Sequence, residues 1–138
     1  MKAIIDTCVV IDFLLDRKPF CNTARKVFEI CAMEKCSGYI TAKSVADIYY
    51  IAHRHTHSDI EARRILQKIL SLVNIIDTTA EDIIYALQSN IKDYEDAILD
   101  ASAMRTNVYC IVTRNIKDYK KSSREVYTPK QFISKLSQ

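Results

Sequence analysis

The sequence contains few of the residues that interrupt secondary structure. Among its 138 residues there is one glycine, Gly38, and there are two prolines, Pro19 and Pro129. A single glycine excludes the glycine-rich loops that hold nucleotide phosphates, such as GxGxxG and the P-loop. No Gly-, Pro- or Ser-rich linker divides the chain either, so we expect one domain that spans residues 1–138.

Long apolar runs and paired cysteines are also absent. No stretch approaches the roughly 18 apolar residues that a membrane span needs, so we predict a cytoplasmic protein without a membrane partner. The cysteines are odd in number and form no CxxC pair, and they are Cys8, Cys21, Cys31, Cys36 and Cys110. This pattern favours reduced thiols in the core over disulfides or a zinc site.

The spacing of apolar residues indicates the fold class. Short runs rich in branched residues, typical of buried strands, occur at residues 3–5, 39–40, 73–76 and 109–112. Helical spacing extends over residues 22–35, 44–55, 59–71, 80–88 and 94–105, and a last helix is expected after Pro129. Strands that alternate with helices indicate an α/β fold, in which helices cover a parallel sheet.

Asp6 is the first candidate for a functional residue, because it directly follows the first apolar run. In an open parallel sheet, ligands bind in the crevice at the carboxyl ends of the strands. A carboxylate there is costly unless it is paired, hydrogen-bonded or bound to a metal. An equally good explanation is that Asp6 is the N-cap of a helix starting near Cys8. Asp12 either reaches the same crevice or lies on the polar face of this short helix.

A second group of carboxylates lies on one predicted helix. Asp93, Asp96 and Asp100 follow the spacing i, i+3 and i+7, which places them on one face. Their charges repel, and a bound cation is one way to relieve that repulsion. The alternative is that Asp93 and Asp96 cap the helix and that Asp100 is a solvated charge.

Two further groups of polar residues complete three separated blocks. Asp47 points away from the apolar stripe of its helix, towards solvent or a cleft, and the sequence alone favours solvent. Residues 113–118 form a polar cluster after the last predicted strand. The blocks contain Ile4, Ile5, Asp6, Thr7 and Asp12, then residues 93–97, then Thr113, Arg114, Asn115, Lys117, Asp118 and Tyr119. In this order and spacing, nearly the whole chain resembles the PIN-domain nucleases, in particular the small VapC-like toxins of bacterial toxin-antitoxin pairs.

The resemblance implies a three-layer α/β/α sandwich with a mostly parallel sheet of about five strands. It also implies a Mg²⁺ or Mn²⁺ site that hydrolyses RNA phosphodiester bonds, with Asp6 and Asp96 as principal ligands. Asp47 falls where the family usually has glutamate, and Asn115 falls where many members have aspartate. Both are expected to act as lateral ligands of the metal. Asp118 is close enough to supply the negative charge that Asn115 lacks.

The implied partners are an RNA substrate, a small antitoxin and a second copy of the chain. The net charge of +3 mildly favours a polyanion. Basic residues that could hold phosphates beside the cut are Arg17, Lys18, Arg114, Lys117, Lys120, Lys121 and Arg124. Candidate residues for a homodimer surface are Ile65, Ile69 and Leu72, although core packing explains them equally well.

The sequence leaves one serious alternative function open and disfavours two others. A degenerate PIN domain that binds RNA or a protein without cleavage is the main alternative, because Asp47 and Asn115 replace stronger ligands. A phosphoacceptor domain, modified at Asp6 or Asp77, would normally need paired acids after the first strand and a lysine after the last. A zinc site is disfavoured because HExxH is absent and a helix ends near the three histidines, which are His53, His55 and His57.

Overall fold

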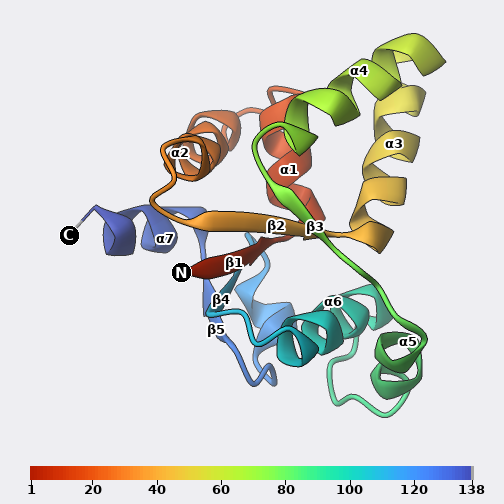
Figure 1. Ribbon diagram of the computed structural model, residues 1–138, viewed down its shortest axis with the longest axis vertical. Coiled ribbons are helices and arrows are strands. Elements are labelled where there is room, and N and C mark those ends of the chain that lie inside the picture. The colour runs from red at the N-terminus through yellow and green to blue at the C-terminus, as the bar shows by residue number, and fades with distance from the viewer. Residues whose placement is uncertain (138) are drawn as a thin grey trace.

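The computed structural model describes residues 1–137, which form helices on both faces of a central sheet (Figure 1). The sheet has the order β3-β2-β1-β4-β5, and every neighbouring pair is parallel. Its strands are β1 (Lys2–Ile5), β2 (Ser37–Thr41), β3 (Asn74–Ile76), β4 (Cys110–Val112) and β5 (Glu125–Tyr127). The predicted α/β/α sandwich with five strands is therefore confirmed.

The predicted helices are found with shifts of a few residues at their ends. They are α2 (Cys21–Ala32), α3 (Ala42–Thr56), α4 (Asp59–Leu70), α5 (Ala80–Ala86), α6 (Tyr94–Arg105) and α7 (Pro129–Leu136). The short helix near Cys8, one of the two explanations of Asp6, is α1 (Thr7–Leu14). A 3₁₀ helix, η1 (Ile116–Tyr119), follows β4.

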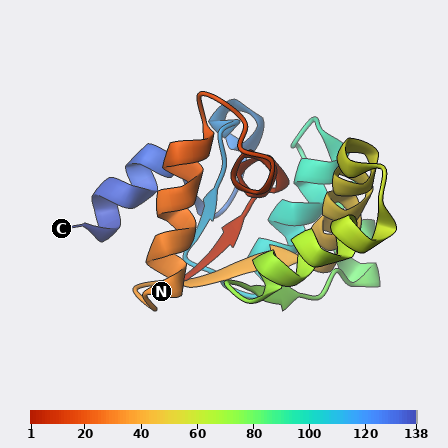
Figure 2. The same cartoon turned by 90° about the horizontal axis from the view of Figure 1, so that it is seen from above.

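The first strand contacts both cores of the protein, because successive side chains of a strand point to opposite faces of the sheet. Ala3 and Ile5 pack in a core with residues of α1, α2 and α7, whereas Ile4 packs with residues of α5 and α6. Figure 2 shows α2 and α7 side by side at one end of the sheet and the pair α3 and α4 at the other. The sheet is thus covered on both faces, and Ala3, Ile4 and Ile5 of its central strand are buried.

The single glycine is explained by close packing between β2 and α2. A Cβ at Gly38 would lie 2.7 Å from Sγ of Cys31 and 3.0 Å from Cγ1 of Val73. Glycine has no Cβ, and a strand can then approach a helix this closely.

The cysteines confirm the prediction of unpaired thiols in the core. All five are free, four of them are buried and Cys8 is half-buried. Ile69 is wholly buried in the core, so it is not available for a dimer surface. Within residues 1–137, no helix is long and apolar enough to cross a membrane.

The sheet order determines where the polar residues gather. After β1, the chain builds β2 and β3 on one side of β1 and then returns to build β4 and β5 on the other. The connections therefore diverge at the carboxyl end of β1, and ligands bind at such a point in open α/β sheets. Asp6, Thr41 and Thr113 stand at the ends of β1, β2 and β4.

Candidate active site

Asp6 is held in a fixed orientation at the end of β1. Its backbone N–H donates to the carbonyl of Val112, 2.9 Å away, which continues the pairing of β1 with β4. One carboxylate oxygen accepts the N–H of Thr7 at 2.8 Å and caps α1, and the other accepts the hydroxyl of Thr113 at 2.8 Å. Burial raises the pKa of Asp6, and these hydrogen bonds offset part of the rise. The residue is therefore both a helix cap and a buried strand-end carboxylate.

Asp96 lies in the first turn of α6 and faces the same region. Asp93 caps this helix by accepting the backbone N–H of Asp96 at 3.0 Å, which confirms the predicted capping role for Asp93. Burial, together with the negative charges of Asp6 and Asp93, raises the pKa of Asp96 to about 7. Because the charge of Asp6 makes ionisation of Asp96 more costly, a cation close to both carboxylates would stabilise the pair.

Tyr119 connects the two aspartates, a role that was not predicted from the sequence. Its side chain is 1% exposed, and its hydroxyl donates to Asp96 at 3.1 Å. A hydrogen bond from the same side chain lowers the pKa of Asp6. Burial and both negative charges raise the pKa of Tyr119, so its hydroxyl stays protonated and keeps donating. The aromatic residue at the end of the polar cluster was the available signal in the sequence.

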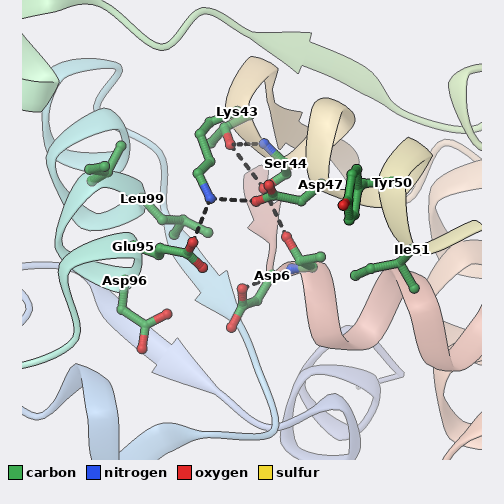
Figure 3. Close-up of a pocket in the computed structure, with 12 residues that line it drawn as sticks. Asp6, Lys43, Ser44, Asp47, Tyr50, Ile51, Glu95, Asp96 and Leu99 are labelled. Atoms are coloured by element: carbon green, nitrogen blue, oxygen red, sulfur yellow. Dashed lines mark hydrogen bonds and ion pairs between the residues drawn. The ribbon is translucent and has the colours of Figure 1, made fainter. Parts of the chain in front are cut away.

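Asp47 lines the same cavity as Asp6 and Asp96, but it is paired with a lysine. The cavity has a volume of about 300 Å³. Nζ of Lys43 lies 2.5 Å from Asp47 and 3.0 Å from Glu95 (Figure 3). Burial lowers the pKa of Lys43, but the hydrogen bonds and charges of the two acids outweigh burial and leave the pKa raised. The sequence favoured solvent over a cleft for Asp47, and the structure instead places it in the lining of the cavity.

Asn115 and Asp118 lie beside the cavity but are not among the residues that line it. Both are exposed, at the start of η1 and within it. The backbone N–H of Asn115 donates to the hydroxyl of Thr113 at 3.0 Å, and that hydroxyl in turn holds Asp6. The negative charge of Asp118 contributes to the raised pKa of Asp96.

Asp12 and Asp100 are both buried, but each has a separate partner. Asp12 forms an ion pair with Arg114 at 2.5 Å, and the pair lines a different cavity. Asp100 accepts a hydrogen bond from Ser122. Asp100 is therefore not the solvated charge that the alternative interpretation expected.

The candidate basic residues differ in whether their side chains already have a partner within the protein. Arg114 is occupied by Asp12 and stacks on Phe20, with 4.0 Å between the guanidinium carbon and the ring centre. Arg124 donates to the side chain of Asn107. The remaining candidates are exposed and include Arg17, Lys18, Lys117, Lys120 and Lys121.

The donors at the cavity suit a hard cation that keeps part of its water shell. Asp6 and Asp96 offer carboxylate oxygens, and Mg²⁺ is typically bound by one or two carboxylates together with several waters. In the part of the chain that the structure describes, no three side chains of His, Cys, Asp or Glu form a ready-made metal cage. An ion that needs a full protein cage, such as structural Zn²⁺, does not fit.

The chain, with its parallel sheet and an acidic cavity at the strand ends, can be assigned to a known protein family. A family model described as PIN domain matches residues 2–117. The chain therefore belongs to the PIN domain family, as the three polar blocks predicted. No match was found among curated proteins.

Solved structures of toxin-antitoxin systems share the fold. VapBC2 from Rickettsia felis, bound to a promoter DNA fragment, is 18% identical with a TM-score of 0.70, covering 92% of this chain and 97% of that chain. A toxin-antitoxin complex from Klebsiella pneumoniae is 24% identical with a TM-score of 0.66 and the same coverage of both chains, 92% and 97%. VapC20 from Mycobacterium tuberculosis, a Sarcin-Ricin loop cleaving toxin, is 12% identical with a TM-score of 0.63, covering 79% and 86%.

Proposed function

We propose that this chain is a single-domain, Mg²⁺- or Mn²⁺-dependent endoribonuclease. The observation that carries the proposal is the pair Asp6 and Asp96, which line one cavity at the carboxyl end of the central strand, where the negative charge of Asp6 contributes to the raised pKa of Asp96. Membership of the PIN domain family supports a nuclease, and the oxygen donors support a hard divalent ion.

In this proposal Asp6 and Asp96 hold the ion, and Asn115, Asp118 and Asp47 are further candidates around it. A bound ion would lower the pKa of a water molecule and stabilise charge on the phosphate. The work of the chain is to keep the two carboxylates in position. Thr113 and the N–H of Thr7 fix Asp6, and the buried hydroxyl of Tyr119 fixes Asp96. The attacking water gives up a proton as its oxygen bonds to phosphorus, the P–O ester bond breaks, and the leaving oxygen takes up a proton.

The proposed substrate is RNA, and the proposed setting is a toxin-antitoxin pair in the cytoplasm. A solved structure with the same fold is described as a toxin that cleaves the Sarcin-Ricin loop, and others are toxin-antitoxin complexes. We extend these properties to this chain as a proposal, with a small antitoxin as protein partner and a homodimer as the assembly. The exposed lysines and arginines near the cavity would contact RNA phosphates.

The proposal is tested with purified protein, a structured RNA and Mn²⁺ or Mg²⁺. Asp6→Asn and Asp96→Asn are expected to abolish cleavage and to weaken Mn²⁺ binding in calorimetry, with unchanged circular dichroism. Glu29→Gln, on an exposed position of α2, is the matched control and should cut normally. Cleavage by both aspartate variants at the rate of the wild type would contradict the assignment.

A second candidate function is RNA or protein binding without cleavage. It is favoured by the contact of Lys43 with Asp47, because an ammonium group then occupies a carboxylate that the family uses beside the metal. The same assay separates the two functions. RNA binding by metal-loaded wild type without any product would support the second candidate over the first.

A further inference from the structure

Lys43 reaches into the acidic cavity from the start of α3. Besides its contact with Asp47 of the same helix, it contacts Glu95 of α6, so its ammonium group joins two helices across the cavity (Figure 3). The cavity is lined by four carboxylates, from Asp6, Asp47, Glu95 and Asp96. Within the described residues, Lys43 supplies the one basic side chain of the lining.

The position of Lys43 is built into the backbone at the end of β2. Its own N–H donates to the hydroxyl of Thr78 at 3.1 Å. Thr41 caps α3, because its hydroxyl oxygen accepts the N–H of Ser44 at 3.1 Å. The hydroxyl of Thr7, in α1, donates to the hydroxyl oxygen of Ser44 at 3.0 Å. The first turn of α3 is thereby hydrogen-bonded to Thr7, the residue that follows Asp6. These contacts fix the position of Lys43 relative to Asp6.

Helix stability does not explain a lysine at this position. The N-terminal turn of a helix carries partial positive charge, which disfavours a cation there. In the pair Lys43 and Asp47 the base precedes the acid, and this order at i, i+4 stabilises a helix less than the reverse order. A contact with Glu95 from another helix, in the cavity of the candidate metal site, indicates a role in the site itself.

We propose that Lys43 is a catalytic residue that takes the place of a second divalent ion and binds the scissile phosphate of the RNA. This inference rests on the proposed nuclease function and deepens it. An ammonium group has three N–H donors, and Asp47 and Glu95 accept two, which leaves one for a phosphate oxygen. Lys43 stays protonated throughout and only stabilises negative charge on the phosphate, as cationic clamps do in phosphoryl transfer.

The inference divides the cavity into two halves with different tasks. Asp6 and Asp96 form the half that holds one divalent ion, with Tyr119 between them. Asp47 and Glu95 form the half that orients Lys43. Asp47 is then a positioning residue and not a metal ligand.

The first test counts bound metal in the absence of RNA. Mn²⁺ is titrated into metal-free protein, and free Mn²⁺ is followed by electron paramagnetic resonance. We expect one Mn²⁺ per chain for the wild type, none at this site for Asp6→Asn, and a second, weaker ion for Lys43→Met, because this variant frees Asp47 and Glu95. Two equally tight ions in the wild type, or an unchanged count of one in Lys43→Met, would overturn the inference.

The second test separates binding from catalysis. At a Mn²⁺ concentration that fills only the tighter site, Lys43→Met should lower kcat for RNA cleavage about 100-fold with a KM changed less than about threefold, which is the order of loss seen when one charge-stabilising donor is removed. Lys43→Arg keeps the charge and should retain kcat within about tenfold. Lys26→Met, on an exposed position of α2, is the matched control. Cleavage by Lys43→Met at the wild-type rate would overturn the inference.

Failure of the proposed function has a different signature. A wild type that binds one Mn²⁺ through Asp6 but cuts no RNA contradicts the nuclease, whereas the metal count in Lys43→Met still decides whether the lysine replaces a second ion. If the wild type cuts RNA and binds two ions, the proposed nuclease function stands and the proposed role of Lys43 is wrong.

Discussion

Asp96→Asn is expected to stabilise the metal-free protein at neutral and alkaline pH. Burial and the charges of Asp6 and Asp93 raise the pKa of Asp96 from 3.8 to about 7. The unfolded chain therefore releases this proton near its ordinary pKa, whereas the folded chain keeps it to a higher pH. Between the two values the unfolded state binds fewer protons, so the free energy of unfolding falls as pH rises. Above about pH 7 the loss is complete.

The size of this effect follows from the pKa. A rise from 3.8 to about 7 corresponds to about 4 kcal/mol, at about 1.4 kcal/mol for each pKa unit. Asp96 is partly exposed, so solvent screening reduces this value, and we expect about 2 kcal/mol. Asparagine keeps an oxygen for the hydroxyl of Tyr119 and carries no charge. The gain should therefore appear at pH 8 and nearly vanish at pH 4.

Urea unfolding with a chelator, at pH 4 and pH 8, measures the effect for the wild type and for Asp96→Asn. Glu29→Gln, remote from the cavity, is the control for loss of one surface charge. Added Mn²⁺ should reverse the order, because an ion at about 100 times its Kd adds about 2.7 kcal/mol to the wild type alone. If Asp96→Asn is less stable than the wild type at pH 8 without metal, the view of this site as a strained anionic pair is wrong.

Two further predictions concern stability away from the cavity. Gly38→Ala should lower the free energy of unfolding in urea by about 1–3 kcal/mol, because its Cβ would lie 2.7 Å from Sγ of Cys31 and 3.0 Å from Cγ1 of Val73; a loss no larger than that of an exposed control variant would speak against this packing. Arg114→Met should cost about 3 kcal/mol in the same assay, since it leaves the buried carboxylate of Asp12 without its partner. Asp12→Leu added to Arg114→Met should recover most of that loss, and no recovery would mean that the ion pair is not its cause.

The layers of the fold could be predicted from the sequence, because helical periodicity and buried strands leave strong local patterns. The strand that the pattern missed is β5, with only the residues Glu125, Val126 and Tyr127 at the edge of the sheet. Its glutamate is exposed and the other two side chains are half-buried, so no apolar run marks it. Short edge strands are defined by their neighbour, here β4, and not by their own composition.

The candidate site was predictable only in part. Asp6 and Asp96 stand out because a strand end and a helix face mark them in the sequence. The contacts that surround them join distant positions, such as Lys43 with Glu95 and Arg114 with Asp12. Lys43 sits on the helix of Asp47 without any local sign that it faces an acid from α6. Such pairings depend on how the helices pack and have no signal in the spacing of residues.

The hydrogen bond between Thr113 and Asp6 joins residues 107 positions apart, across the two central strands. Chains leave the ribosome amino end first, and β1 is made long before its neighbour β4. The hydrogen bond that holds Asp6 in place therefore cannot form until more than three quarters of the chain has been synthesised. If the chain degrades RNA, this topology delays the damage, because a growing or truncated chain carries an incomplete site beside the very RNA that encodes it.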